Sequence, residues 1–381
     1  MSSRFLRPRS FAVAMLAVAV PAALAVATAV PGASARTFGA ENEFHQTNLI
    51  SDLGNQGAQV VDKDLHNPWG LAFGPTTPLW AADNNSGVAT LYSITPGGTT
   101  AAKVPLTVTL PGGRASTGDG SSPTGQVFNP TSGFVVTSPA GSGPGLFIFS
   151  AEAGQISAWS PVADPIKAGA STAQVEFSSP TAVYKGLAIA STNDGTFLYA
   201  SNFHDGTVDV FNSSFQLVHL RGNFRDRHLP RGYAPFGIEE INGLIYVTYA
   251  LQNAAKHDDV AGPGHGFIDI YTNNGILVKR LVSRGDLNSP WGLAEAPTGF
   301  GPFGGKLLVG NFGNGLIHAY GLFSGRPHGA LLDEQRKAIQ IDDLWALKFG
   351  TATTGGTGTL LFSAGINDEM DGLVGSINPV P

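Results

Sequence analysis

The sequence contains no cysteine, and only 13% of its residues are charged. The lack of cysteine excludes a disulfide framework and any thiolate nucleophile or thiolate metal site. Positive charge is also scarce, because 22 Lys and Arg face 28 Asp and Glu, for a formal net charge of −6. An acidic chain is a poor partner for nucleic-acid backbones and anionic membrane surfaces, so we expect no nucleic-acid partner.

Helical patterns are scarce as well. No segment after the N-terminal region has a sustained 3.6-residue apolar period, and the best helical candidate, Leu332 to Lys337, is shorter than two turns. The chain instead has 50 Gly, 25 Pro and 42% hydrophobic residues. This composition is typical of a turn-rich all-β protein with a substantial core, and it argues against disorder.

Common catalytic signatures are also missing from the sequence. It has no Gly-x-Ser-x-Gly nucleophile elbow, no His-Glu-x-x-His and no Walker A loop. The stretch Gly299–Gly304 matches Gly-x-Gly-x-x-Gly. It leads into an expected strand at 306–309 rather than into a helix, so we interpret it as a turn and not as a nucleotide-binding loop.

The N-terminus has the pattern of a signal peptide. Three arginines precede an apolar run over 11–30, and Ala33-Ser34-Ala35 supplies a small-x-small cleavage pattern. We predict a signal peptide at 1–35 and a secreted or periplasmic protein with no stable membrane insertion after cleavage. Cleavage removes three Arg and changes the formal charge from −6 to −9. An uncleaved anchor stays open as an alternative, since about 20 apolar residues can span a bilayer.

A repeated unit begins at Asn67-Pro68-Trp69-Gly70-Leu71-Ala72-Phe73 and recurs towards the C-terminus. Each unit has a turn, a short apolar strand, a second strand that ends in an Asn/Asp/Gly bend, and a third strand. The first strands align at Gly70, Gly133, Gly186, Gly237, Gly292 and Ala346. A period of this length predicts stacked or radially arranged units of about four strands.

The sixth unit is one strand short, and an unpaired strand over 47–51 precedes the first unit. We therefore predict an all-β fold, a six-bladed β-propeller whose last blade is closed by the N-terminal strand, as a single domain over 36–381. In unit one the expected strands are 70–73, 79–82, 88–94 and 103–110. The Gly-, Ser- and Thr-rich stretch 111–126 is interpreted as a linker between units one and two.

The alternation of apolar strand, Asp/Asn-rich bend and apolar strand resembles the NHL-repeat propellers. More closely, the chain resembles an uncharacterised family of exported bacterial six-bladed propellers, some of which carry a C-terminal sorting tail. The matching stretches are 47–53, 67–70, 123–129, 246–250, 256–264, 311–315 and 344–350. The resemblance covers about 44–378 and implies a fold but no activity. The chain ends at Pro381 without a sorting tail, so anchoring through the C-terminus is not expected.

In a propeller of this connectivity, the bends between second and third strands open on one face around the central channel. Asn, Asp and Gly are favoured in tight turns, which explains each bend taken singly. Together the bends are predicted to form a polar funnel for a small molecule or a cell-surface polymer. The candidate ligand residues are Asp83, Asn84, Asn202, His204, Asp205, Lys256, His257, Asn311, Asn367 and Asp368.

The bend over 252–265 is the longest. Adjacent carboxylates beside imidazoles are able to hold a divalent ion, with Ca²⁺ favoured by oxygen ligands and a transition metal by a His-plus-Asp set. The candidate metal ligands are Asp258, Asp259 and His265. The alternative is a solvated loop whose two aspartates cap the backbone or pair with nearby Lys or Arg.

Two functions remain open from the sequence. The first is an extracytoplasmic binding or interaction module that uses the polar funnel. The second is a metal-dependent hydrolase or lactonase with an ion in the funnel and a carboxylate or His as general base. Trp69, Trp291 and Trp345 recur at equivalent positions. We expect them to pack between blades rather than to stack on sugar, and we expect the protein to be a monomer.

Overall fold

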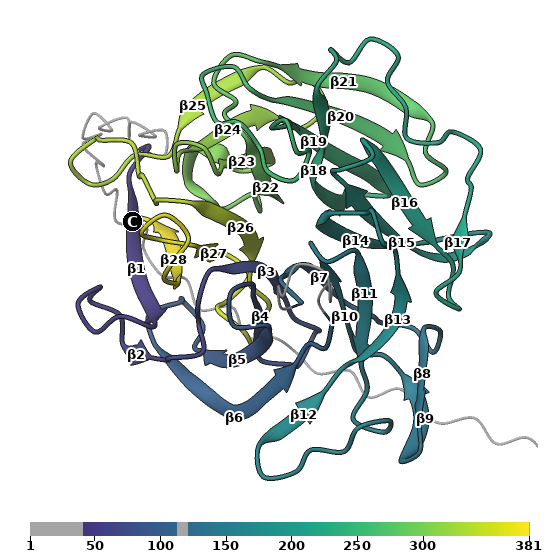
Figure 1. Cartoon of the computed structure of the whole chain (residues 1–381). Coiled ribbons are helices and arrows are strands. Elements are labelled where there is room, and N and C mark those ends of the chain that lie inside the picture. Colours follow the sequence, from purple (N-terminus) through teal and green to yellow (C-terminus); the bar gives the residue numbers. More distant parts are fainter. Residues whose placement is uncertain (1–40, 113–120, 381) are drawn as a thin grey trace, which may run out of the picture. The chain divides into compact units, whose positions relative to one another are not determined.

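The computed structural model describes residues 41–112 and 121–380. Six mainly antiparallel sheets stand around a central axis, with one further two-stranded hairpin (Figure 1). The prediction of a six-bladed β-propeller is therefore confirmed. The predicted signal peptide over 1–35 lies outside the described residues. Within the described part of the chain, no helix has the length and apolar character needed to cross a bilayer.

Blades 1 and 2 are linked at their outer edges by a strand from blade 2 that pairs with blade 1. Blade 1 consists of β3 (Pro68–Ala72), β4 (Leu79–Asp83), β5 (Val88–Ile94) and β6 (Ala101–Thr109). Blade 2 consists of β7 (Pro123–Phe128), β10 (Phe147–Ala151), β11 (Gln155–Trp159) and β13 (Gln174–Ser178). The hairpin β8 (Val135–Ser138) and β9 (Gly141–Pro144) is inserted within blade 2. From the same blade, β12 (Ala170–Thr172) crosses over to pair in parallel with β6.

Blades 3 to 5 each have four consecutive antiparallel strands. Blade 3 has β14 (Tyr184–Thr192), β15 (Gly195–Asn202), β16 (Thr207–Phe211) and β17 (Leu217–Val218). Blade 4 has β18 (Tyr233–Ile241), β19 (Leu244–Leu251), β20 (Phe267–Thr272) and β21 (Leu277–Ser283). Blade 5 has β22 (Pro290–Glu295), β23 (Lys306–Asn311), β24 (Ile317–Gly321) and β25 (Pro327–Ala330), with the 3-10 turn η1 (Gly301–Phe303) before β23.

Blade 6 joins the two ends of the propeller. It combines β26 (Leu344–Phe349), β27 (Leu360–Ala364) and β28 (Leu373–Pro379) with β1 (Phe44–Ser51), and β2 (Val60–Val61) adds a short parallel pair. The β1 strand runs antiparallel to β28, from Phe44 opposite Pro379 to Ser51 opposite Leu373. This confirms the predicted closure, which covers the edge that β28 would otherwise expose.

The predicted start of blade 2 at Gly133 is wrong. The inner strand is β7, and Gly125 takes the place of Gly70, so the predicted linker over 111–126 overlaps this strand. The strand was hidden because its polar side chains bond to neighbouring backbone: Gln126 donates to the carbonyls of Gly70 and Trp80. Polar residues with such partners are stable in a buried strand. The strand then lacks the hydrophobic pattern by which strands are recognised in a sequence.

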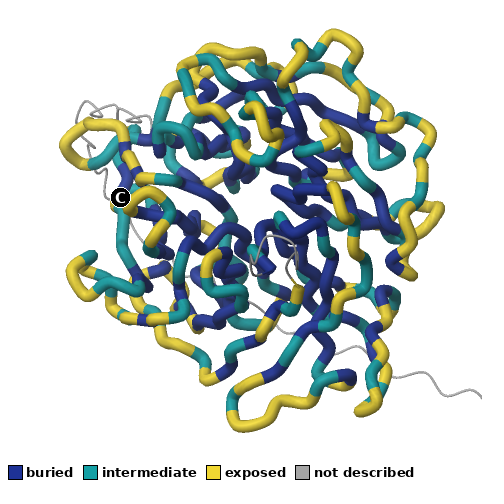
Figure 2. The backbone as a smooth tube through the Cα atoms, viewed as in Figure 1, coloured by how far each residue is buried: buried dark blue, intermediate teal, exposed yellow. Residues whose placement is uncertain are grey.

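The inner strands lie close together around the axis, and Figure 2 shows them as buried backbone. A β-carbon built on Gly70 would lie 2.6 Å from the carbonyl oxygen of Thr124 in the next blade. On Gly292 it would lie 2.5 Å from the carbonyl oxygen of Trp345. The recurring glycine is therefore required by the approach of the neighbouring backbone.

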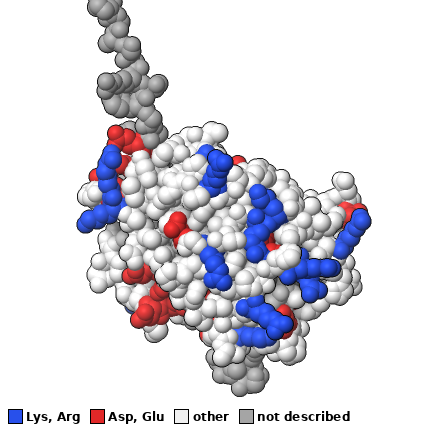
Figure 3. Space-filling model, turned by 90° about the horizontal axis from the view of Figure 1, so that it is seen from above, with Lys and Arg blue, Asp and Glu red and all other residues white. Residues whose placement is uncertain are grey.

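The outer surface carries both signs of charge. Figure 3, seen from above the view of Figure 1, shows Lys and Arg in several separate groups, with Asp and Glu groups between them and towards one edge. The face shown in this view therefore has no continuous patch of one sign.

Candidate functional site

One end of the central channel is formed by the residues that directly precede the five inner-strand glycines and Ala346. These are Trp69, Thr124, Lys185, Phe236, Trp291 and Trp345. The ring centroids of Trp69 and Trp345 are 3.4 Å apart and stacked, and Trp291 meets both edge-on. All three tryptophans are buried. They pack between blades, as predicted, and form an aromatic plug below the funnel.

Lys185 is the one cation in this ring of residues. Its side chain is 3% exposed, and its Nζ lies 5.1 Å from the centre of the Trp69 ring. The ammonium forms an ion pair with Glu152, and Asp258 Oδ1 lies 3.7 Å away. Burial acts to lower the pKa of Lys185, but the carboxylates of Glu152, Asp258 and Asp259 together raise it above its ordinary value, so the lysine stays charged.

Two of the predicted bends converge on this lysine. Asn84 Nδ2 donates to the second carboxylate oxygen of Glu152 at 3.2 Å. From the long bend, His257 Nδ1 lies 2.6 Å from Asp258 Oδ1. This contact with His257 lowers the pKa of Asp258 to about 2, and the same contact raises the pKa of His257. The result is a charged network that links blades 1, 2, 3 and 4.

A second chain of hydrogen bonds begins at the aromatic plug. Trp345 Nε1 donates to Asn67 Oδ1 at 2.9 Å, and Asn67 Nδ2 donates to Glu369 Oε2 at 2.8 Å. Burial raises the pKa of Glu369 to about 7. This carboxyl group is therefore able to take up or release a proton near neutral pH, as a general acid or base must.

Beside Glu369 lies a polar cavity of about 390 Å³ between blades 5 and 6. Its lining includes three carboxylates, three amides and one aromatic ring. The residues are Asp342, Asp343, Asp368, Asn314, Gln340, Asn367 and Phe312. No Lys or Arg is among the residues that line it. Phe312 stacks on Trp345 with a centroid separation of 4.1 Å, which places the cavity next to the aromatic plug.

The predicted metal ligands Asp258, Asp259 and His265 do not form a metal-sized group among the described residues. His265 Nδ1 instead lies 2.7 Å from the Val260 carbonyl oxygen. The structure groups Asp258 with His257 and Glu152, whose ligand atoms lie within 4.8 Å of one another. The Lys185 ammonium already provides the positive charge for Glu152 and Asp258. A Ca²⁺ or other divalent ion would have to compete with it.

Three other predicted residues are buried and bond to groups of their own blades. Asp83 accepts from Thr90 at 2.7 Å, Asn202 donates to Asp209 at 3.0 Å, and Asn311 donates to the Asp286 carbonyl at 2.8 Å. Side chains of this kind stabilise tight turns. Their positions explain the bends, and one further polar atom, Asp83 Oδ1, is buried without a hydrogen-bond partner.

The remaining predicted residues lie nearer the surface. His204 Nδ1 is 2.9 Å from Asp205 Oδ1. Lys256 is exposed and has a left-handed backbone with φ of 56°. Asn367 and Asp368, in contrast, line the polar cavity.

Sequence reasoning missed Lys185 and Glu152. The repeat alignment already held a signal for Lys185, because this residue precedes Gly186 where three other units have Trp. The repeat alignment held no corresponding signal for Glu152. It directly follows β10, and only the neighbouring blade gives its carboxylate a partner.

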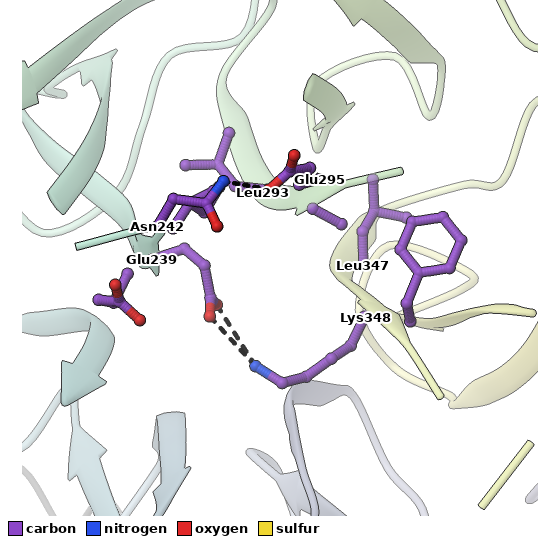
Figure 4. A pocket seen from close by; sticks show the side chains of 10 residues that line it. Glu239, Asn242, Leu293, Glu295, Leu347 and Lys348 are labelled. Atoms are coloured by element: carbon purple, nitrogen blue, oxygen red, sulfur yellow. Dashed lines mark hydrogen bonds and ion pairs between the residues drawn. The ribbon is translucent and has the colours of Figure 1, made fainter. Parts of the chain in front are cut away.

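The opposite end of the channel opens into a cavity of about 340 Å³ (Figure 4). Glu239, Leu293 and Lys348 extend into it from three different inner strands. Lys348 Nζ lies 3.2 Å from Glu239 Oε1, and this pair crosses the space. Burial raises the pKa of Glu239, although Lys348 acts in the other direction. None of these residues was predicted as a site.

Comparison with solved structures gives similarities at low sequence identity. One is the streptogramin B lyase structure, with TM-score 0.44, 10% identity and coverage of 88% of this chain and 97% of that chain. Another is the periplasmic gluconolactonase of Pseudomonas aeruginosa, with TM-score 0.44, 15% identity and coverage of 82% and 85%. Similarities of this size say nothing about activity.

No protein-family model matches the chain. Two curated proteins of Acanthamoeba polyphaga mimivirus, uncharacterized proteins R648 and L690, are each 32% identical to it over 337 residues. The matches cover 86% of this chain, 78% of R648 and 84% of L690. These relatives are viral, so they lend no support to the bacterial source and export implied by the resemblance. The chain belongs to the same protein family as R648 and L690 of this virus.

Proposed function

We propose that this protein is an extracytoplasmic binding module that uses the polar funnel. Its ligand is a small polar molecule, or an exposed group of a cell-surface polymer, that carries hydrogen-bond donors or a positive charge. The observation that carries the proposal is the cavity beside Glu369, which is lined by three aspartates and three amides and by no basic residue.

The bend that supplies part of this cavity is held in an unfavourable backbone conformation. Asn367, Asp368 and Glu369 are consecutive and have φ of 59°, 53° and 61°. Left-handed residues other than glycine cost about 1–3 kcal/mol each in strained sites, with Asn and Asp tolerated best. Strain of this kind clusters at functional sites, and here it directs Asn367 and Asp368 to the cavity.

Charge defines the class of ligand. The carboxylates of Asp342, Asp343 and Asp368 line one space, while the nearest buried cation of the funnel, Lys185, is already paired with Glu152. Unpaired carboxylates in a concave site raise the local concentration of cations. An ammonium or guanidinium group, or a dense set of hydroxyl donors, is therefore the best complement.

A metal-dependent hydrolase or lactonase is the second candidate. It is favoured by Glu369, whose pKa of about 7 suits a general base, and by the group of Glu152, His257 and Asp258. Against it, the Lys185 ammonium is bound to two members of that group. The contacts of Lys185 with Glu152 and Asp258 therefore favour the binding module over the hydrolase.

The test is a ligand screen by thermal shift and calorimetry on the full chain, with spermidine and choline as cationic probes and sorbitol as a neutral polyol. We expect a saturable response that is weakened at least tenfold in D368N and D342N. D194N is the matched control, because Asp194 is exposed in the β14–β15 turn. The proposal fails if no probe binds, or if D368N and D342N both bind as the wild type does.

The same preparation separates the two candidate functions. Lactone and phosphoester hydrolysis is measured with and without chelator, and metal content is measured on purified protein. Turnover that is lost with chelator and in E369Q would favour the hydrolase. Export is tested separately by N-terminal sequencing of the secreted protein, for which cleavage after Ala35 is the expected result.

A further inference from the structure

A second group of metal-ligating side chains lies where the ring closes. Asp52 directly follows β1, His66 lies two residues before β3, and Asp371 lies in the bend between β27 and β28. One ligand atom from each lies within 4.8 Å of the other two. The closest measured pair is His66 Nδ1 and Asp52 Oδ2, at 3.2 Å. Three segments that are far apart in sequence thus bring two carboxylates and an imidazole together.

The carboxylates are held in place by donors outside the group. The backbone N–H of Gly372 donates to Asp52 Oδ1 at 2.8 Å, and Asn367 Nδ2 donates to Asp371 Oδ2 at 2.8 Å. The carbonyl oxygen of Met370 lies 3.3 Å from His66 Nδ1 and adds a further oxygen. Outer hydrogen bonds of this kind orient the ligands in metal sites.

The charge of this group is not compensated by a basic side chain. The Asp52 side chain is 4% exposed and lies against a second carboxylate, and the only ion pair of the three residues within the described chain is the one to His66. The group of Glu152, His257 and Asp258 differs, because it has the Lys185 ammonium. Burying a carboxylate beside another is costly unless a cation is present.

We propose that Asp52, His66 and Asp371 bind one divalent transition-metal ion that fastens the closing strand to the first and last blades. Two carboxylates and one imidazole suit Zn²⁺ or Mn²⁺, whereas Ca²⁺ takes six to eight oxygen ligands. The ion stabilises the closed ring, because the three ligands come together only when β1 is paired with β28. Asn367 joins this site to the polar cavity, because it lines the cavity and donates to Asp371.

The test uses the full chain stripped of metal and then dialysed against Zn²⁺ or Mn²⁺. We expect one equivalent of metal per chain and a rise in melting temperature of about 3 °C at saturating metal. H66Q and D371N should lose both effects. E334Q is the matched control, because Glu334 pairs with His45 at 2.9 Å on the outside of β1 without a third ligand.

Two further measurements identify which side chains bind the metal. The visible absorption of bound Co²⁺ depends on its coordination geometry and ligands, so the spectrum of the wild type should be lost in H66Q, or shifted if any Co²⁺ still binds. H257Q tests the other group and should keep the full equivalent of metal. The proposal is overturned if wild-type protein takes up no metal, if D371N and H66Q retain it, or if H257Q alone loses it.

Discussion

The carbonyl oxygen of Trp291 lies 2.0 Å from the point that a β-carbon on Gly237 would occupy. Both are backbone features of neighbouring inner strands, β18 and β22, so neither is free to rotate away. The contact shows that the separation of blades at the axis is set by backbone against backbone. Larger side chains at these positions must push the blades apart.

Gly237→Ala is expected to destabilise the protein by about 1–3 kcal/mol or more, because the added methyl group overlaps a main-chain oxygen. Urea unfolding followed by tryptophan fluorescence measures this change. Gly54→Ala is the control, since a β-carbon added at Gly54 would have no other atom within 4 Å. Equal stability of the two variants would contradict the close approach of the inner strands.

Lys185→Met should be among the most damaging substitutions near the funnel. It leaves the Glu152 carboxylate partly buried without its cation, at a cost of about 3–5 kcal/mol. The double variant K185M/E152Q should recover part of that loss, because the unpaired charge is removed as well. K279M, at an exposed lysine, serves as the control for urea unfolding. A double variant no more stable than K185M would argue against the pairing.

Glu369 should make stability depend on pH. Its pKa is about 7 in the folded protein against an ordinary value of 4.5, so the folded state binds the proton more tightly. The contribution of this residue to stability is therefore greatest below pH 4.5, falls as pH rises from 4.5 to 7, and is constant above that. Glu369→Gln keeps an acceptor for Asn67 but cannot ionise.

The measurement is the free energy of unfolding of wild type and E369Q between pH 4 and 8. Between pH 4.5 and 7 the free energy of unfolding of E369Q should rise relative to that of the wild type. Above about pH 7 the difference between the two should stay constant. D368N, which alters the neighbouring exposed carboxylate, is the control. Parallel curves across the entire range would show that Glu369 titrates normally.

Removal of β1 should open the ring. A chain that begins at Asp52 lacks Leu49 and Ile50, both fully buried, and exposes the backbone edge of β28. We expect it to aggregate, whereas a chain that begins at Glu41 elutes as a folded monomer in size-exclusion chromatography. A synthetic peptide of residues 41–51 should restore solubility to the shorter chain. Soluble, cooperative folding without the peptide would disprove the need for closure.

Much of the propeller architecture could be predicted from local patterns in the sequence. The repeated Pro-Trp-Gly turns, the alternating strands and the unpaired strand before unit one predict the number of blades and their closure, because these features are local or periodic. Blade 2 was misplaced by the same logic. In β7 the side chains of Thr124 and Gln126 donate hydrogen bonds to backbone carbonyls of other strands. Those partners are distant in sequence, so no local pattern predicts them.

The funnel was predicted as a region rather than as a set of contacts. Asn84, His257 and Asp258 were chosen from separate bends and do converge, but on Lys185 and Glu152, which were not chosen. Asp83, Asn202 and Asn311 were chosen from the same kind of sequence pattern, and the structure shows them buried and hydrogen-bonded within their own blades. Turn chemistry and ligand chemistry use the same amides and carboxylates, so composition does not separate them.

By itself the sequence determined the class of fold, the six repeats and the strand that completes the ring, since each follows from the spacing of apolar residues and turns along the chain. Tertiary structure alone decided which charges meet. The pairing of Lys185 with Glu152, the burial that brings the pKa of Glu369 to about 7, and the meeting of Asp52, His66 and Asp371 all join different blades or both ends of the chain. Electrostatic interactions depend on distance and burial in space, and neither is encoded in the order of residues within one repeat.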